Sequence, residues 1–159
     1  MTKLPEFAVR CYGNDDRLPR EAEEMFSKEL ACSRTPLPEA RPDRDQWRFA
    51  CVCAVTADGH VLGGVHLDIG PISFGPLAKE KLAFVEAVFV RPECRGQGVG
   101  TRVMREAVSV ARKAGCLHMR CNVRWDNPAA IALYRKCGFA LVDISGPGET
   151  GEYFVVRPL

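Results

Sequence analysis

A glycine-rich turn flanked by arginines is the segment of this sequence best suited to bind a ligand. The stretch RPECRGQGVGTRVM, residues 91–104, packs three glycines into five residues between an apolar run and a helical pattern. The amides and the dipole at a helix N-terminus bind phosphate, and glycine lets a ligand approach the backbone closely. Arg102 and Arg105 stand where a helix ordinarily carries acids, which is unfavourable for an empty helix. We therefore favour an anion site here over a plain turn with solvated arginines.

The two commonest nucleotide-binding motifs do not fit this turn. A P-loop needs Lys followed by Ser or Thr after its glycines, and neither pair follows these. A Rossmann fingerprint needs a third glycine where this chain has Thr101 or Val103, and an acid further on to hold a ribose. No acid stands near residue 120. We therefore predict that the turn binds the phosphate of a ligand other than those bound by P-loop and Rossmann proteins.

Glu86 is the candidate general base, because it is the one charge in the apolar run LAFVEAVFV. A carboxylate in a buried strand is costly unless it is bonded, paired or neutralised, and burial favours proton uptake. Strand alternation would place Glu86 on the same face as Val88 and Val90. A structural carboxylate paired with a neighbouring element is the alternative. His66 and Asp68, which alternate on the preceding strand, are reserve candidates, although His66 fits an ordinary strand histidine better.

The eight cysteines indicate buried packing rather than metal or disulfide chemistry. The sequence has no C-x-x-C pair, and its three histidines show no metal-ligand spacing with the cysteines. We find no secretion signal that would place the chain in an oxidising compartment. Most of the cysteines are therefore expected to be small buried hydrophobes, with no metal bound. Cys94 is the exception, because it lies in a polar turn among arginines that would stabilise a thiolate.

Charge and hydropathy set the partners and the compartment that we expect. The net charge is only +2, so the overall charge of the chain does not favour binding to nucleic acid or to a membrane. No apolar run approaches the ~20 residues of a membrane span, and the N-terminus lacks the pattern of a signal peptide. We expect a cytoplasmic protein, with residues 1–159 forming a single domain.

Hydrophobic periodicity and turn residues predict alternating strands and helices that position these groups. Helices are expected at 18–32, from the glycine turn to Gly115, and from Asn127 as N-cap to Gly138. Residues 33–46 form a loop or a broken helix. The predicted fold class is mixed α/β, with one sheet that is antiparallel early and covered by helices. The expected strands are 7–12, 47–55, 60–69, 82–90, 116–123, 139–144 and 152–158.

Two motifs are separated by the strand expected at 116–123. An apolar strand followed by R-x-x-G-x-G and a helix is filled by Arg95, Gly98 and Gly100. The pattern N-x-x-A-x-x-x-Y-x-x-x-G-F is filled by Asn127, Ala130, Tyr134, Gly138 and Phe139. Together they resemble the acyl-CoA-binding motif [RQ]-x-x-G-x-[GA] and the downstream helix of the GNAT superfamily of N-acetyltransferases, and the order of the expected elements fits the family over nearly the whole chain. The resemblance implies the GNAT fold, whose central mixed sheet is mostly antiparallel and flanked by helices.

The resemblance also implies a reaction, the direct transfer of an acetyl group from acetyl-CoA to an amine. In the family the coenzyme's pyrophosphate rests on the amides of the glycine turn, its pantetheine arm pairs with the preceding strand, and a strand amide holds the thioester carbonyl. Tyr134 is implied as the acid for the thiolate, although an isolated aromatic on such a helix would be interpreted as core. Asn127 is implied to touch the pantetheine arm as well as to cap its helix. The implied coenzyme-binding residues are Val88, Phe89, Val90, Arg95, Gly96, Gln97, Gly98, Val99, Gly100, Thr101, Asn127 and Tyr134.

The amine acceptor is the least predictable partner. Family acceptors include small amines, aminoglycosides, polyamines, protein N-termini and lysines, bound by the early helix region and the last loops. Here these regions, residues 33–48 and 145–153, carry acids and arginines in near balance, so their charge favours no class. We expect the amine of a small molecule rather than of a protein. Homodimers are common in the family, so the resemblance makes a homodimer a further expectation.

Two other functions stay open on the sequence alone. A non-catalytic acyl-CoA-binding module would keep the glycine turn but lack a competent base or an acceptor pocket, and the presence of Glu86 and Tyr134 argues against it. A nucleic-acid-binding protein would use the arginine stripe between residues 91 and 112, which lacks interleaved aromatic residues. Cys94 and Cys121 are treated as bystanders, because the resemblance requires no acyl-cysteine.

Overall fold

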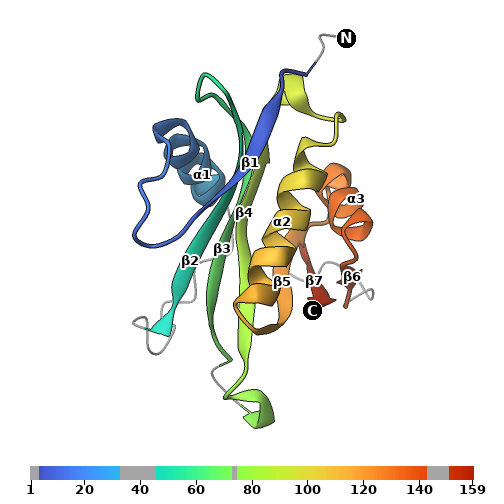
Figure 1. The fold of residues 1–159 in the computed structure, drawn as a ribbon. Helices are drawn as coiled ribbons and strands as arrows, with labels where there is room; N and C mark the ends of the chain where they lie inside the picture. Colours follow the sequence, from blue (N-terminus) through green and yellow to red (C-terminus); the bar gives the residue numbers. More distant parts are fainter. Residues whose placement is uncertain (1–3, 33–45, 73–74, 143–150) are drawn as a thin grey trace.

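The computed structural model of the chain describes residues 4–32, 46–72, 75–142 and 151–159. Within them a seven-stranded sheet forms the centre of the molecule, in the order β1-β2-β3-β4-β5-β7-β6 (Figure 1). The strands are β1 Phe7–Tyr12, β2 Arg48–Thr56, β3 Val61–Pro71, β4 Lys81–Val90, β5 Cys116–Arg124, β6 Ala140–Leu141 and β7 Glu152–Pro158. The helices are α1 Arg20–Cys32, α2 Val99–Lys113 and α3 Pro128–Lys136, and short 3-10 turns cover Gly75–Leu77 and Pro92–Cys94.

The sheet is mixed, and among the described strands one parallel pair joins β4 to β5. From β1 to β4 each neighbouring pair is antiparallel, and so are the pairs formed by β5, β7 and β6. Antiparallel neighbours follow from tight connections, such as the turn between β2 and β3 where Gly59 has φ 90°. The parallel pair requires a crossover, which α2 supplies. The predicted mixed α/β class with an antiparallel first half is confirmed.

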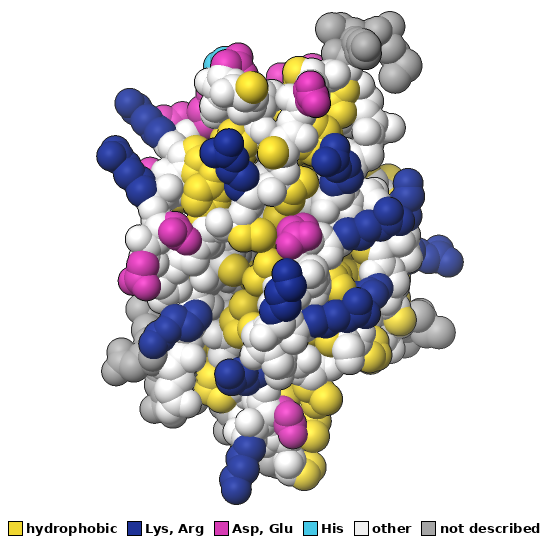
Figure 2. Space-filling view, in the orientation of Figure 1, with side chains coloured by type: hydrophobic (Ala, Val, Ile, Leu, Met, Phe, Trp, Pro, Cys, Tyr) yellow, Lys and Arg dark blue, Asp and Glu magenta, His cyan; other side chains and the backbone are white. Residues whose placement is uncertain are grey.

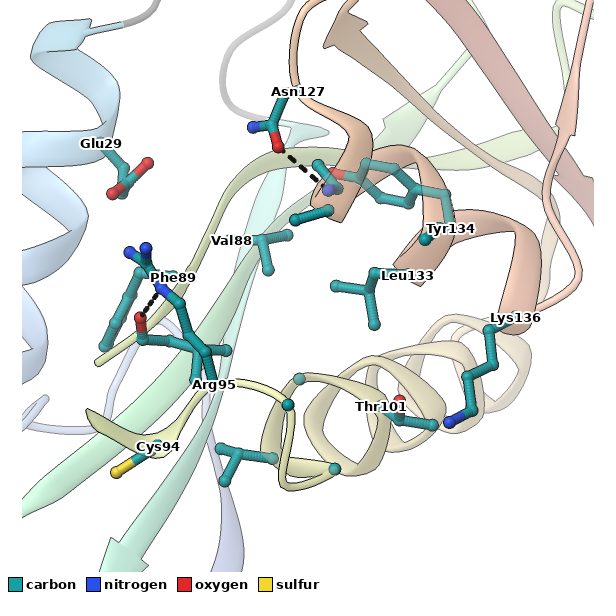
Figure 3. A pocket seen from close by; sticks show the side chains of 18 residues that line it. Glu29, Val88, Phe89, Cys94, Arg95, Thr101, Asn127, Leu133, Tyr134 and Lys136 are labelled. Carbon is teal, nitrogen blue, oxygen red and sulfur yellow. Dashed lines mark hydrogen bonds between the residues drawn. The ribbon is translucent and has the colours of Figure 1, made fainter. Parts of the chain in front are cut away.

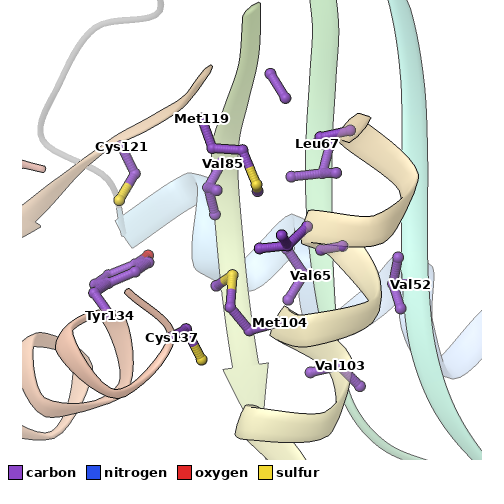
Figure 4. Close-up of a cluster of buried hydrophobic side chains, with 14 of the residues drawn as sticks. Val52, Val65, Leu67, Val85, Val103, Met104, Met119, Cys121, Tyr134 and Cys137 are labelled. Carbon is purple, nitrogen blue, oxygen red and sulfur yellow. The ribbon is translucent and has the colours of Figure 1, made fainter. Parts of the chain in front are cut away.

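The larger hydrophobic core lies between α2 and the sheet. Figure 1 shows α1 on one face of the sheet and α2 with α3 on the other. Apolar residues recur on α2 at helical spacing, so one face of the helix is buried, as predicted. Figure 4 shows Val103 and Met104 of α2 in one cluster with Val65 and Leu67 of β3. Each such side chain contributes about 1.5–3 kcal/mol when fully buried, so α2 is held firmly against the strands.

A smaller core holds α1 against the other face of the sheet. Ala22 and Phe26, one turn apart on α1, are buried in it. The ring of Phe26 meets the ring of Phe89 of β4 edge-on, with centroids 4.9 Å apart, a favourable aromatic arrangement. This contact fixes α1 over β4, so that the later turns of the helix, which include Glu29, lie beside the strand.

A β-bulge interrupts β4 at Glu86. His66 of β3 pairs with Ala87, whereas the next residue of β3 pairs with Val85, so the register gives Glu86 no partner position. The extra residue reverses the alternation of faces. Val85 belongs to the core under α2, and Ala87 belongs to the core under α1. The argument from alternation, which gave Glu86 and Val88 one face, therefore does not hold.

The two loops that were expected to surround the acceptor fall largely outside the described residues. Of the region 33–48 the structure describes residues 46–48, and of the region 145–153 it describes residues 151–153. Among the described helices, α2 is the longest with 15 residues, and none has the length and the apolar character that a bilayer span requires.

Candidate functional site

A cavity of about 420 Å³ opens where β4 meets the glycine turn. Its wall is built from α1, the end of β4, the turn with the start of α2, and α3 with its cap (Figure 3). The volume is typical of small-molecule sites. Of the coenzyme-binding residues expected from the sequence, all but Gln97 line the cavity, whereas the Gln97 side chain donates to the Glu93 carbonyl at 2.9 Å. The lining residues that were expected are Val88, Phe89, Val90, Arg95, Gly96, Gly98, Val99, Gly100, Thr101, Asn127 and Tyr134.

The glycine turn presents backbone amides at the start of α2. Gly96 and Gly98 have φ of 73° and 86°, a left-handed conformation that favours glycine. A Cβ built on either residue would meet no protein atom within 4 Å, so the space in front of both is open. The first α-helical bond joins the Arg102 amide to the Gly98 carbonyl at 3.0 Å, and the amides just before Arg102 have no acceptor within the helix. The turn therefore offers donors and a helix dipole to an anion.

The cations on the cavity wall differ from those that the sequence pattern emphasised. The Arg102 guanidinium lies 4.1 Å from the centroid of the Phe7 ring of β1, and neither Arg102 nor Arg105 lines the cavity. Both residues are exposed. Figure 2 shows Lys and Arg side chains spread over one face of the molecule. Arg95 and Lys136 do line the cavity. These two side chains are the ones placed to meet the charge of a bound anion.

Strand β4 has an open backbone edge along the cavity. β5 pairs with β4 only from Lys81 to Phe84, and no described strand pairs with β4 on that side beyond this point. On the opposite side β3 continues the ladder as far as Val90. Val88, Phe89 and Val90 line the cavity at the open edge. Unpaired backbone N–H and C=O groups on such an edge can pair with an extended ligand.

Tyr134 is buried in the cavity wall and keeps its proton. Burial raises the pKa of its hydroxyl well above the ordinary value, and the neighbouring Cys121 and Cys137 act in the same direction. The hydroxyl donates a hydrogen bond to the Cys121 sulfur across the gap between α3 and β5 (Figure 4). Its ring meets that of Phe139 edge-on, with centroids 5.3 Å apart. Tyr134 is therefore a positioned hydrogen-bond donor over the neutral pH range.

Asn127 caps α3, as predicted. Its Oδ1 accepts a hydrogen bond from the Ala130 amide at 3.0 Å, which satisfies one of the donors at the helix start. Pro128 occupies the first helical position, where its missing N–H costs nothing. The dashed bond in Figure 3 occupies the side-chain oxygen, so the Asn127 amide nitrogen is the group that can donate into the cavity.

The sequence model of the Acetyltransferase (GNAT) family matches residues 20–139. The chain belongs to this family. An aminoglycoside N(6′)-acetyltransferase type 1 of Klebsiella aerogenes is 32% identical over 93 residues, which are 58% of this chain and 60% of that enzyme. The N-alpha-acetyltransferase RimI of Mycobacterium tuberculosis is 42% identical over 60 residues, 38% of this chain and 36% of that enzyme. The chain thus spans about a third to two thirds of the length of the curated relatives it matches.

The GNAT fold extends over nearly the whole chain. The structure of a GCN5-related N-acetyltransferase from Kribbella flavida matches with a TM-score of 0.62 at 22% identity, covering 96% of this chain and 98% of that one. At this level of identity the likeness concerns the fold, and function has to be argued from the site. The expected GNAT architecture, a mixed and mostly antiparallel sheet with flanking helices, is confirmed.

Within the GNAT fold, the residues considered as base stand outside the cavity wall. Glu86 is half-buried at the bulge of β4 and does not line the cavity. His66 does not line it either, because its ring stacks on Phe49 and lies edge-on to Phe26, with centroids 5.9 and 5.7 Å away. Its Nδ1 is 3.9 Å from the Asp68 carboxylate. His66 therefore belongs to the packing beside α1, as the simpler interpretation of this histidine predicted.

Cys94 is a buried thiol, so the expectation of a stabilised thiolate is wrong. The turn Pro92–Cys94 directs the side chain inward, where the residue is 4% exposed and joins the core under α2. Burial and the adjacent Glu93 carboxylate raise its pKa, and Arg91 acts in the opposite direction. Apart from Cys11, the other cysteines whose surroundings are described are also buried, as expected. Among the described residues, no three His, Cys, Asp or Glu side chains are grouped to hold a metal ion.

Two charged residues of the GNAT cavity are not marked by any sequence motif used above. Glu29 reaches the wall from α1, and Lys136 reaches it from the last turn of α3 (Figure 3). The available signal for Glu29 was its helical spacing, three residues after the buried Phe26, because such positions share a face. Lys136 follows Tyr134 by two positions, and that spacing by itself indicates no common face.

Proposed function

We propose that residues 1–159 act as one acetyl-CoA-dependent N-acetyltransferase domain, which transfers an acetyl group directly to the primary amine of a small molecule. The observation that carries the proposal is the continuity of two binding features. The open edge of β4 runs through Val90 into the glycine turn at the start of α2. A ligand that joins an extended arm to a pyrophosphate needs these two features side by side. Membership of the GNAT family supports the reaction type.

The coenzyme is held mainly by backbone groups. The backbone of Val88–Val90 pairs with the pantetheine arm, and the amides from Arg95 to Thr101 receive the pyrophosphate. The amide nitrogen of Asn127 donates to the arm from the opposite wall. When bound, the coenzyme supplies an activated acetyl thioester. A backbone amide at the open edge of β4 donates to the thioester carbonyl and stabilises the negative charge that develops there.

Two proton transfers accompany the acyl transfer. The amine nitrogen forms a bond to the acetyl carbon, the carbon–sulfur bond breaks, the amine loses a proton and the sulfur gains one. In this proposal Glu86 accepts the proton of the amine through a water molecule, because this carboxylate of β4 does not line the cavity itself. Tyr134, whose hydroxyl keeps its proton, donates to the departing sulfur. No cysteine takes part, because the transfer is direct.

One observation favours a second candidate function, a non-catalytic acyl-CoA-binding module. Such a module would keep the glycine turn and the open edge of β4 without a base in contact with the acceptor. The position of Glu86 outside the cavity wall fits that description. The module differs from the enzyme in one measurable respect, because it binds acetyl-CoA and releases no thiol with any amine.

Calorimetric titration with acetyl-CoA tests the coenzyme assignment, with dephospho-CoA, NAD and ATP as comparators. We expect acetyl-CoA to bind more tightly than NAD or ATP. Failure of acetyl-CoA to bind would overturn the proposal. Thiol release measured over a panel of small amines then separates the two candidates. Release with at least one amine supports the enzyme, and binding without release over the whole panel supports the module.

A further inference from the structure

The cavity passes from one face of the sheet to the other. Its glycine turn and α3 lie on the α2 side, whereas Glu29 reaches the wall from α1, which Figure 1 shows on the opposite face. The separate cores under α2 and under α1 agree with this arrangement. The passage exists because β5 stops pairing with β4 after Phe84. A ligand seated on the glycine turn therefore leaves room for a second ligand on the α1 side.

Three charged side chains line the cavity within the described residues. Among the described residues that line the cavity, Glu29 is the only carboxylate, and Arg95 and Lys136 are the cations. Figure 3 shows Lys136 beside Thr101, at the end of the cavity away from Glu29. The Nε of Arg95 donates to the Val90 carbonyl at 3.1 Å, which holds this side chain to the end of β4. Figure 3 shows the Arg95 guanidinium directed toward Glu29, so the α1 side of the cavity holds one carboxylate and one guanidinium, and Lys136 stands apart from both.

The surroundings of Glu29 suit a cationic ligand. Partial burial raises the pKa of this carboxyl, and Arg95 acts in the opposite direction. Removal of water disfavours the charged form of a carboxylate, and an entering cation favours it again. An ammonium group brings three donors and forms charge-assisted hydrogen bonds with a carboxylate. Glu29 is exposed in the free protein, so a ligand that covers it displaces water and strengthens the attraction between the carboxylate and a cation.

We propose that Glu29 receives the ammonium group of the amine acceptor, so that the acceptors are small cationic amines. The inference rests on the proposed function, because the amine has to meet a thioester held along β4. In this role Glu29 binds the acceptor and takes no proton from it. It positions the amine on the α1 side of the opening between β4 and β5, opposite the groups that hold the coenzyme.

Two amines of equal length separate charge from shape in the test. They are 1,5-diaminopentane and 5-aminopentan-1-ol, in which a hydroxyl replaces the second ammonium. Glu29→Gln keeps the size and the helix propensity of the side chain and removes its charge. Glu23→Gln makes the same change on the same helix, outside the cavity wall, and is the matched control. Thiol release gives KM and kcat, calorimetry gives the acetyl-CoA affinity, and an NMR titration follows amine binding directly.

Glu29→Gln should raise the KM for 1,5-diaminopentane at least about tenfold, with kcat and acetyl-CoA affinity within about twofold of the wild type. Glu23→Gln should match the wild type in all three quantities. If Glu29→Gln raises the KM more for the diamine than for the amino alcohol, the proposal is supported and the second ammonium is the group that binds Glu29. If the KM rises equally for both amines, the proposal is also supported, and the ammonium that reacts is the group that binds Glu29.

Three results overturn the inference. The first is an unchanged amine KM in Glu29→Gln. The second is a change confined to acetyl-CoA affinity, which would mean that Glu29 acts through Arg95 on the coenzyme. The third is a wild-type protein that binds acetyl-CoA but neither acetylates 1,5-diaminopentane nor shifts its NMR resonances when the amine is added. A wild-type protein that fails to bind acetyl-CoA overturns the proposed function, and this inference with it.

Discussion

The Nη2 of Arg91 donates a hydrogen bond of 2.8 Å to the carboxylate of Glu21, which joins α1 to the residue that follows β4. The same carboxylate accepts from the Val61 amide at 2.9 Å and lies 2.9 Å from the ring Nδ1 of His60. The start of α1, the turn between β2 and β3, and the approach to the glycine turn therefore meet at Glu21. Because α1 also carries Glu29, this contact fixes the two sides of the cavity relative to each other.

Substitution of Glu21 by Gln should destabilise the protein in a pH-dependent way. Hydrogen bonds from the Val61 amide, His60 and Arg91 lower the pKa of Glu21 from 4.5 to about 2. A lowered pKa contributes stability that is fully present above 4.5 and is lost as the pH falls from there toward 2. Because 36% of the side chain is exposed, we expect a cost of about 1 kcal/mol at pH 7 after allowing for solvent screening. Urea unfolding of both proteins at pH 7 and pH 3 measures the difference, which should shrink at pH 3.

His60 adds a second pH dependence of opposite sign at the same contact. The hydrogen bond with Glu21, followed by the charge of Asp58, raises the pKa of His60. Its contribution is therefore present below the ordinary value of 6.5 and is lost as the pH rises through the raised value. The control is Glu24→Gln, which breaks an exposed pair with Arg20 and should cost less than about 0.5 kcal/mol. Equal costs for the Glu21 and Glu24 variants would contradict the role given to Glu21.

Gly98→Ala should weaken the binding of acetyl-CoA. Gly98 has φ 86°, where a Cβ is strained, and the new methyl group would enter the open space in front of the amides. We expect a loss of about 1–2 kcal/mol in unfolding free energy and a loss of at least about tenfold in acetyl-CoA affinity. Gly115→Ala, at the other end of α2 with φ 76° and equally open space, is the matched control. It should lose similar stability and keep its affinity for acetyl-CoA. Equal acetyl-CoA affinities of the two variants by calorimetry would contradict the assignment of the phosphate site to this turn.

Tyr134→Phe should slow the reaction with little effect on coenzyme binding. The substitution removes the hydroxyl that donates to the Cys121 sulfur and, in our proposal, to the departing sulfur. We expect kcat to fall at least about tenfold and the Kd for acetyl-CoA to stay within about twofold. Tyr12→Phe, on β1 and outside the cavity wall, should leave both quantities unchanged. Steady-state kinetics with calorimetry measures them, and a full rate in Tyr134→Phe would reduce Tyr134 to a packing residue.

Asn127 allows its two roles to be separated by two substitutions. Asn127→Ala removes the cap of α3 and should cost about 1 kcal/mol in unfolding free energy. Asn127→Asp keeps a side-chain oxygen for the Ala130 amide, so the stability should stay within about 0.5 kcal/mol of the wild type. It removes the nitrogen donor, so acetyl-CoA affinity should fall severalfold. Wild-type affinity in Asn127→Asp would show that this residue serves the helix alone.

Glu86→Gln should lower kcat, because the amine would lose the base that we assign to its proton. A general base contributes about a hundredfold or more to a rate, and the amide of Gln cannot take a proton. Glu80→Gln, which removes an exposed carboxylate just before β4 and outside the cavity wall, is the control. The measurement is kcat between pH 6 and pH 9. A profile unchanged by Glu86→Gln would assign the proton to water alone.

Elements that depend on neighbouring residues in the chain could be predicted from the sequence. The cap at Asn127 and the proline after it act within a single turn of α3, so residue types and order determine them. The buried face of α2 follows from helical spacing in the same way. The glycine turn was predictable because the left-handed conformations of Gly96 and Gly98 are local.

Features that depend on contacts between distant segments could not be predicted. The bulge at Glu86 is a register shift between β3 and β4, and no residue type in the sequence indicates it. Cys94 lies among charges in the sequence, but its turn places it against the core under α2. Glu29 reaches the cavity because Phe26 and Glu21 fix α1 over the sheet. Each of these positions follows from packing that only the folded chain provides.

In our proposal, the open edge of β4 makes the coenzyme a structural component as well as a reactant. In the described part of the sheet no strand pairs with β4 on this side beyond Phe84, and open edges of this kind also attract the strands of other molecules. A pantetheine arm that pairs there completes the sheet. At a hundredfold excess over its Kd such a ligand adds about 2.7 kcal/mol to the free energy of unfolding. Growth conditions that deplete acetyl-CoA would then lower the abundance of this protein as well as its turnover, because the unliganded chain is the form open to aggregation and proteolysis.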